Sequence, residues 1–145
     1  MNDASRTTAT GLWTDGKGML AAAEVLMRED NRPTKMQFFM VTHFLLGHGI
    51  EVMLKSVLLA HGYGLDELRK KIGHDLTKAA RRVINLDLDP VSSFVASNSG
   101  LVRQLNCYYS RKHFEYRVTG AMHLPPTEEI AAFLGHLVKM TRPKL

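Results

Sequence analysis

The sequence has only one cysteine, Cys107, among its 145 residues. A single cysteine excludes an internal disulfide framework and a zinc site built from several cysteines. We expect its thiol to lie in the core, because free cysteine behaves as a small hydrophobe. The chain also lacks an uninterrupted apolar run near the roughly 20 residues of a membrane span, and its N-terminus lacks the pattern of a secretory signal. These absences predict a cytoplasmic protein with no membrane partner.

Sequence motifs for cofactors are missing as well. The chain has seven histidines, but none shows the paired spacing of a zinc-binding helix. The glycine patterns of phosphate loops and of dinucleotide-binding folds are also absent. We therefore expect neither a metal ion nor an organic cofactor.

What the sequence does have is helical periodicity. Apolar residues make up 45% of the chain and recur every three or four positions, and no segment shows the alternation of a strand. The length suits one domain, which we place at 11–145 after a polar, flexible segment at 1–10. The predicted fold class is an all-α bundle of about five helices. These helices are expected at about 12–28, 34–60, 75–84, 90–114 and 127–138, with a short helical turn at 65–71.

The longest predicted helix, 34–60, contains two glycines. Gly47 and Gly49 each cost up to about 1 kcal/mol relative to alanine inside a helix. Close approach of a neighbouring helix is the favoured reason to keep them, and a kink is the alternative.

Polar residues of the same helix form the first candidate site. His48, Glu51 and Lys55 share one helix face because their spacing is i, i+3 and i+7. An ion pair on the surface would be a purely structural explanation. Their place in the most apolar helix instead favours a partly buried charge cluster, which often serves function or specificity. Downstream, the sequence G-H-D-L places His74 and Asp75 at a helix start, where they fit a cap or an anion site.

The second candidate site is a stretch of alternating aromatic and cationic residues at 108–117. Four cations face one acid between 103 and 117, so part of the net charge of +5 is concentrated there. Proteins that bind single-stranded nucleic acid use this pattern to stack bases and contact phosphates. The amphipathic end of a helix whose tyrosines cover the core edge is an equal alternative. The candidate side chains for ligand contact are Tyr109, Arg111, Lys112, His113 and Tyr116.

Arg117 is the last residue of that stretch, and His123 follows it with five residues between the two. In a ribonuclease that uses no metal, an arginine can stabilise the pentacovalent phosphate while a histidine moves protons near neutral pH. We therefore take these two residues as the candidate catalytic pair.

Several of these elements, taken together, resemble one known family. Residues 48–59 read H-x-x-E-x-x-L-K-x-x-L-L, G-H-D-L follows at 73–76, and Leu105-Asn106 with Tyr108 leads to Tyr116-Arg117. These segments resemble the second helix, the following element and the segment near the last helix of HEPN domains (higher eukaryotes and prokaryotes nucleotide-binding). The resemblance covers about residues 36–140.

This resemblance implies an up-and-down helical bundle that is commonly dimeric. Many HEPN proteins are toxins or defence proteins that cleave RNA without a metal, through an R-x4-6-H motif at a dimer interface. Arg117 and His123 fit that spacing. Other members have lost the motif and serve as binding modules beside nucleotidyltransferases.

The function that we expect is binding of RNA or a nucleotide by a HEPN-like homodimer. If the protein is an enzyme, it is a metal-independent endoribonuclease of toxin or defence type, with Glu51, Lys55 and His48 organising the site. The alternative is a non-catalytic helical module that binds a protein, such as an antitoxin or a nucleotidyltransferase. Val118, directly after Arg117, favours that alternative. A third interpretation is a small-molecule sensor with a cavity lined by Met40, Phe44 and Met53.

Overall fold

The computed structural model describes residues 6–29, 32–113 and 123–143, and within residues 32–37 only the backbone. Every regular element in these ranges is a helix, which confirms the predicted all-α class. The elements are α1 (Ala9–Met27), α2 (Arg32–Ala60), α3 (Leu65–Glu67) with the π-helical turn η2 (Leu68–Ile72), α4 (Leu76–Asn85), α5 (Val91–Ser97), α6 (Ser99–Tyr109) and α7 (Thr127–Met140).

The helices are more numerous than expected because one predicted helix is divided. The helix expected over 90–114 breaks at Asn98, where φ is −111° and ψ is 17°. Asn98 donates its side-chain amide to the carbonyl oxygen of Phe94 at 2.9 Å. Such local bonding competes with the backbone ladder, so asparagine favours helix ends. The predicted helix is therefore divided into α5 and α6, and the direction in which α6 crosses α2 is not set by α5.

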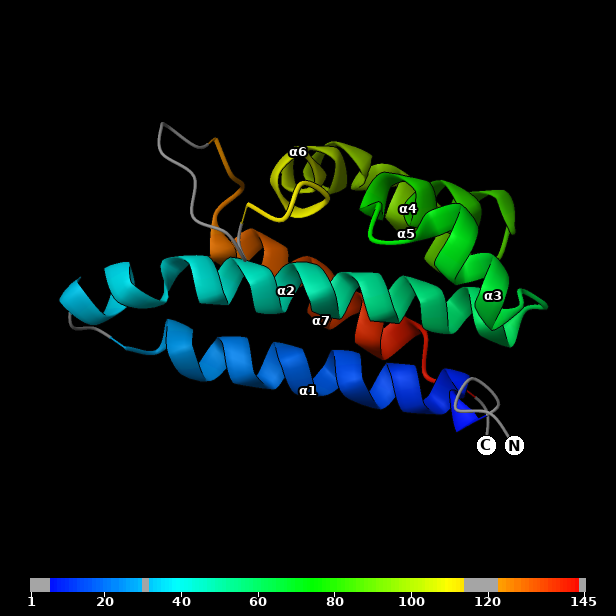
Figure 1. The fold of residues 1–145 in the computed structure, drawn as a ribbon, viewed down its shortest axis with the longest axis horizontal. Coiled ribbons are helices and arrows are strands. Elements are labelled where there is room, and N and C mark those ends of the chain that lie inside the picture. The colour runs from blue at the N-terminus through cyan, green and yellow to red at the C-terminus, as the bar shows by residue number, and fades with distance from the viewer. Residues whose placement is uncertain (1–5, 30–31, 114–122, 144–145) are drawn as a thin grey trace.

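α2 is the centre of the bundle. Figure 1 shows α1 running antiparallel beside it, α7 behind it, and α4, α5 and α6 together on its other side. Side chains along α2 are completely buried between these layers, among them Leu46, Ile50 and Leu54. The segment Phe38–Ala60 is long and apolar enough to cross a membrane, but 67% of its most apolar window is buried inside the bundle. That burial is what a helix at the core of a bundle requires.

The two glycines of α2 are explained by close packing, as predicted. A Cβ at Gly47 would lie 2.7 Å from Cδ2 of Tyr109, and a Cβ at Gly49 would lie 2.7 Å from Cδ2 of Leu134. α1 also comes close here, since a Cβ at Gly16 would lie 3.2 Å from the carbonyl oxygen of Gly49. Glycine therefore lets α6, α7 and α1 approach α2 closely at successive points.

Cys107 is exposed, so its predicted place in the core is wrong. The buried residues of α6 are Val102, Leu105 and Tyr109, which follow helical spacing. Cys107 lies two positions from both Leu105 and Tyr109, which turns it to the opposite face of the helix. The thiol is therefore outside the bundle.

Candidate functional site

Glu51 lies at the centre of a polar cluster where α2 meets α6 and the start of α4. Its side chain is only 4% exposed. The hydroxyl of Tyr109 donates to Oε1 at 2.6 Å, and Nδ1 of His74 lies 2.9 Å from the same oxygen. Lys55 donates from Nζ to Oε2 at 3.0 Å. Nδ1 of His48 lies 3.1 Å from the Tyr109 hydroxyl and 3.8 Å from Glu51 Oε1. We call these five residues the Glu51 cluster.

Local sequence features build this cluster from three separate segments. Gly47 leaves room for the ring of Tyr109, which thereby reaches Glu51 one helical turn further along α2. At the other side, Gly73 adopts a φ of 58°, a conformation that side chains disfavour, and His74 follows directly. Asp75 then caps α4, because its Oδ1 accepts the N–H of Lys78 at 3.0 Å. The capping role considered for Asp75 is thereby confirmed.

Glu51 is held as a carboxylate. Burial raises the pKa of Glu51, but the donors of His48, Tyr109 and His74 and the charge of Lys55 outweigh burial. The pKa falls from its ordinary value of 4.5 to about 2. The cluster therefore contains a permanent buried anion at neutral pH, neutralised by Lys55.

This shift predicts how stability depends on pH. Because the pKa is lower in the folded protein, the stabilisation by Glu51 is fully present above about pH 5 and is lost as the pH falls toward 2. Urea unfolding of wild type and Glu51→Gln at pH 7, 4 and 3 measures this contribution. We expect the stability difference between the two proteins to shrink on acidification. A difference that stays constant over this range would contradict the lowered pKa.

The two histidines of the cluster present their other nitrogens outward. The side chain of His74 is 60% exposed and that of His48 is 31% exposed. Since Nδ1 of each ring faces the cluster, Nε2 lies on the far side of the ring in both cases. A hydrogen bond of this kind fixes the orientation of the imidazole ring.

An open hollow of about 430 Å³ borders the cluster. Lys55, Arg69 and His74 line its polar side, above the buried Glu51. The rest of its wall is apolar and comes from α1, α2, α3 and η2. We call it the His74 hollow. Two cationic side chains, Lys55 and Arg69, line the hollow with one carboxylate, Glu51. The charge of the hollow therefore favours the binding of an anionic group.

The candidate cations of the aromatic stretch lie elsewhere. Arg111 and Lys112 are exposed in the turn that ends α6, and the N–H of His113 donates to the carbonyl oxygen of Tyr108 at 3.0 Å. Tyr109 itself is buried at 5% exposure, so its ring is not a surface for stacking bases. For Tyr109 the core-edge alternative is therefore correct, with an added polar role at Glu51.

Arg117 and Tyr116 lie outside the described residues, and His123 is described. Its side chain is exposed. The N–H of His123 donates to the hydroxyl of Tyr108 at 2.8 Å, and its carbonyl oxygen accepts from Gln104 at 2.9 Å. These bonds tie His123 to α6, not to the Glu51 cluster. The pairing of Arg117 with His123 stays a prediction.

Two residues of the site were missing from the candidates. Asn106 accepts the N–H of Leu76 at 2.8 Å and donates to Asp75 Oδ1 at 3.0 Å, which fixes the start of α4 against α6. Its place in the L-N segment of the family resemblance was the available signal. Arg69 lines the His74 hollow. The sequence gives no signal for it, because it is one of three consecutive cations in an exposed turn.

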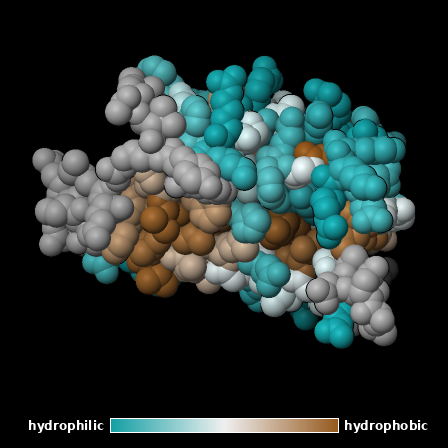
Figure 2. Space-filling view, in the orientation of Figure 1, coloured by the Kyte–Doolittle hydropathy of each residue, from teal (hydrophilic) through white to brown (hydrophobic). Residues whose placement is uncertain are grey.

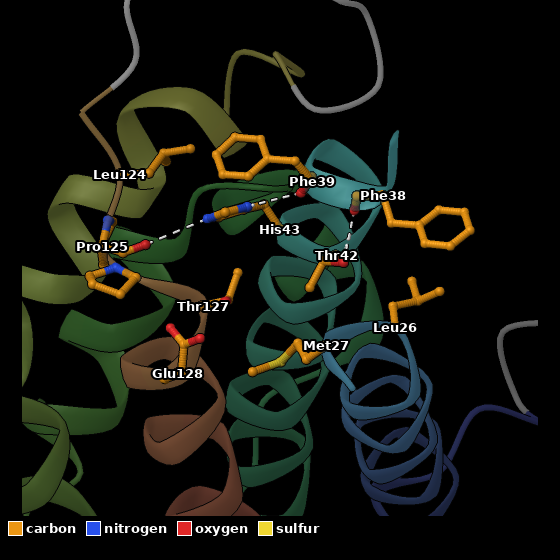
Figure 3. Close-up of a pocket in the computed structure, with 11 residues that line it drawn as sticks. Leu26, Met27, Phe38, Phe39, Thr42, His43, Leu124, Pro125, Thr127 and Glu128 are labelled. Atoms are coloured by element: carbon orange, nitrogen blue, oxygen red, sulfur yellow. Dashed lines mark hydrogen bonds between the residues drawn. The ribbon is translucent and has the colours of Figure 1, made fainter. Parts of the chain in front are cut away.

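A second pocket lies between the end of α1, the start of α2 and the segment before α7. It measures about 370 Å³ and has mostly apolar walls, with Glu128 at its border. Figure 3 shows the ring of His43 between the carbonyl groups of Phe39 and Pro125. Its Nδ1 lies 3.0 Å from the Phe39 oxygen, and its Nε2 lies 3.5 Å from the Pro125 oxygen. His43 thus joins α2 to the segment before α7, and the acidic border disfavours an anion in this pocket.

Met53, proposed as a lining residue of a sensor cavity, is completely buried. The hydroxyl of Thr141 lies 3.2 Å from its sulfur, and a Cβ at Gly16 would lie 2.7 Å from its Cε. Its side chain is therefore packed in the core. No group of three histidine, cysteine, aspartate or glutamate side chains in the described ranges is placed to hold a metal ion.

The fold and this site define an all-helical bundle with a buried carboxylate beside an open, cationic hollow. Comparisons with protein-family models, with curated proteins and with solved structures give no match to the chain. The resemblance to HEPN domains thus depends on the residues quoted above and stays a prediction.

Proposed function

We propose that the protein binds RNA, or a nucleotide, through a phosphate group held in the His74 hollow. One observation carries the proposal: Glu51 is a buried anion that orients the exposed His74 beside Lys55 and Arg69. The three segments of the HEPN resemblance also meet at this point, through Glu51 of α2, His74 before α4 and Asn106 of α6. Because the three segments meet at one site, their arrangement supports a shared role in binding.

The hollow has the chemistry that a nucleotide needs. Arg69 can donate to phosphate oxygens, and Lys55 adds positive charge. The apolar side of the hollow, with Leu12, Val52 and others, suits a base or a sugar. A volume of about 430 Å³ lies within the usual range of small-molecule sites.

Cleavage of RNA without a metal is the enzymatic form of this proposal. The 2′-oxygen of the substrate would attack the phosphorus while a base removes its proton, and an acid would protonate the leaving 5′-oxygen. Arg117 and His123 are the candidate catalytic pair by their resemblance to the HEPN motif. His74, oriented by Glu51, is the alternative proton-transfer group for a phosphate held in the hollow, which His123 does not line. We place this activity in the cytoplasm, in a toxin or defence context.

Arg69→Ala is expected to weaken binding of a fluorescein-labelled single-stranded RNA by about tenfold, or about 1.4 kcal/mol. The slope of log affinity against log salt should fall by about one, because one phosphate contact is lost. Fluorescence anisotropy at several salt concentrations measures both. Lys70→Ala is the matched control, since Lys70 is the exposed neighbour that does not line the hollow. Equal losses in both variants would contradict a site in the hollow.

Incubation of the same RNA in excess EDTA tests for cleavage. Products from wild type that are absent from Arg117→Ala and His123→Ala would support the catalytic pair, and equal activity in all three proteins would contradict it. His74→Gln tests the group oriented by Glu51, with His61→Gln as control, because His61 follows the C-terminal end of α2 and does not line the hollow. Competition by a nucleoside monophosphate separates nucleotide binding from RNA binding.

A protein-binding module is the second candidate function, and exposed apolar side chains favour it. Val25, Phe39 and Val41 are 56%, 44% and 47% exposed. Figure 2 shows a hydrophobic area over the α1–α2 side of the molecule, while the α4–α6 side is hydrophilic. An antitoxin or a nucleotidyltransferase is the partner that the resemblance offers. Loss of a protein partner in Phe39→Ser, with RNA affinity unchanged, would identify this function.

A further inference from the structure

The positive charge of the chain is concentrated on the side of the molecule that α4 and α6 form. These two helices, with the turn that follows α6 to His113, contain no acidic residue. Since the whole chain has a net charge of only +5, the other residues together are slightly acidic. The same side is hydrophilic in Figure 2. An anionic partner is therefore favoured on this side. Its six cationic residues are Lys78, Arg81, Arg82, Arg103, Arg111 and Lys112.

A small hollow of about 240 Å³ lies between α4 and α6. Arg81 of α4 and Arg103 of α6 both line it, together with the hydroxyl residues Thr77 and Ser99. Its other lining residues are apolar, and none of those in the described ranges is acidic. The described residues also place no carboxylate within ion-pair distance of either arginine. We call this feature the Arg81 hollow.

The packing of α4 against α6 brings the two arginines to the same level. The side-chain amide of Asn106 donates to Thr77 Oγ1 at 3.1 Å, which fixes one contact between the helices. Arg81 follows Thr77 by four residues, and Arg103 precedes Asn106 by three, so each lies about one helical turn from that contact. Two unpaired guanidinium groups at one level repel each other, and an anion bound between them would remove that repulsion.

The Arg81 hollow has the chemistry for one phosphate group. Guanidinium groups match phosphate oxygens with paired N–H donors. Thr77 Oγ1 accepts from Asn106, so its own O–H is left to donate, and Ser99 offers a second hydroxyl. The volume is below the roughly 300–1,000 Å³ of sites that hold whole small molecules. A phosphate that belongs to a longer chain therefore suits this hollow better than a complete nucleotide does.

Only the start of α4 separates the Arg81 hollow from the His74 hollow. His74 lines one hollow and Thr77, three residues later, lines the other. Asp75 lies between them, but its Oδ1 already accepts from the N–H of Lys78 and from Asn106. Seven residues separate His74 from Arg81, which corresponds to about 10 Å at the rise of a helix. A strand of a few nucleotides is long enough to reach both hollows.

We propose that the Arg81 hollow is a second phosphate site, and that the ligand is an RNA strand with one phosphate in each hollow. This inference rests on the proposed function of the His74 hollow. It selects RNA over a single nucleotide, because a nucleotide with one phosphate contacts only one of the two hollows. Once the strand is held at one hollow, binding at the other becomes intramolecular. The affinity should therefore rise steeply with the length of the RNA.

Isothermal titration calorimetry with uridine 5′-monophosphate and with an RNA of eight uridines tests the number of sites. Wild type is expected to bind the octamer at least about 100-fold more tightly than the monophosphate. Arg81→Gln/Arg103→Gln should weaken octamer binding by about 100-fold and lower its salt slope by about two. The same variant should bind the monophosphate as wild type does. Arg69→Ala, in the His74 hollow, should weaken the binding of both ligands.

Arg28→Gln/Arg82→Gln is the matched control, because it removes the same charge and neither residue lines the Arg81 hollow. Arg81 and Arg103 are exposed, and circular dichroism verifies that each variant is folded. Equal octamer affinity in the two double variants, or an octamer bound no more tightly than the monophosphate, would overturn the second site. Weakening by Arg69→Ala would in that case still support the proposed function. If Arg81→Gln/Arg103→Gln weakened octamer binding and Arg69→Ala did not, the proposed function of the His74 hollow would fail, and with it the strand that joins the two hollows.

Discussion

Replacing Glu51 with alanine is expected to lower the free energy of unfolding by about 3–5 kcal/mol, the usual cost of breaking a buried ion pair. The substitution leaves Lys55 charged with a side chain only 14% exposed. It also removes the acceptor of the Tyr109 hydroxyl, which lies in the interior between α2 and α6. An uncompensated charge and the loss of the short hydrogen bond from Tyr109 both follow from the removal of one carboxylate, so the effect should exceed that of an ordinary surface substitution.

Urea unfolding at pH 7 measures this loss, and the chain contains a matched control. Glu67 and Lys71 have the same i, i+4 spacing as Glu51 and Lys55, but their side chains are 36% and 64% exposed and the charged atoms are 3.7 Å apart. Glu67→Ala should therefore cost less than about 1 kcal/mol.

A double variant separates the charge effect from packing. Glu51→Met/Lys55→Met removes both charges and should recover a large part of the stability lost in Glu51→Ala. Equal destabilisation by Glu51→Ala and Glu67→Ala would contradict the account of Glu51 as a buried, paired anion.

Part of this site could be predicted from the sequence. Spacing on one helix face is enough to bring His48, Glu51 and Lys55 together, and their apolar surroundings indicated burial. The approach of His74 and Tyr109 depends on where α4 and α6 cross α2, which spacing within one helix does not determine. The family resemblance drew attention to the segments around Glu51, His74 and Asn106, which do meet in the structure. It did not distinguish Tyr109, which contacts Glu51, from Tyr108, which contacts His123.

The differences in the fold have local physical causes. Periodicity predicted the helical class and the bounds of α2 to within about two residues, because a long apolar pattern is a strong signal. The break at Asn98 was missed because apolar residues continue on both sides of it. The exposure of Cys107 was missed because its residue type was weighed above its helical position, although Leu105 and Tyr109 already define the buried face.

Gly47→Ala is expected to destabilise the protein by about 1–3 kcal/mol, although alanine is the better helix former. The new Cβ would lie 2.7 Å from Cδ2 and 3.0 Å from Cε2 of the Tyr109 ring. That ring is buried, and its hydroxyl contacts Glu51 and His48, so it cannot move aside without weakening the Glu51 cluster. The gain in helix propensity is at most about 1 kcal/mol and does not offset such a clash.

Gly18→Ala isolates the propensity effect, because Gly18 lies inside α1 and a Cβ there would meet no atom within 4 Å. Thermal and urea unfolding should show Gly18→Ala to be as stable as wild type or more so, by up to about 1 kcal/mol. Gly47→Ala should also begin to lose stability at a higher pH than wild type, because a weaker bond from Tyr109 lets the pKa of Glu51 rise toward its ordinary value. If the two alanine variants were equally stable, Gly47 would not be needed for the approach of α6, and the position of Tyr109 at Glu51 would require another cause.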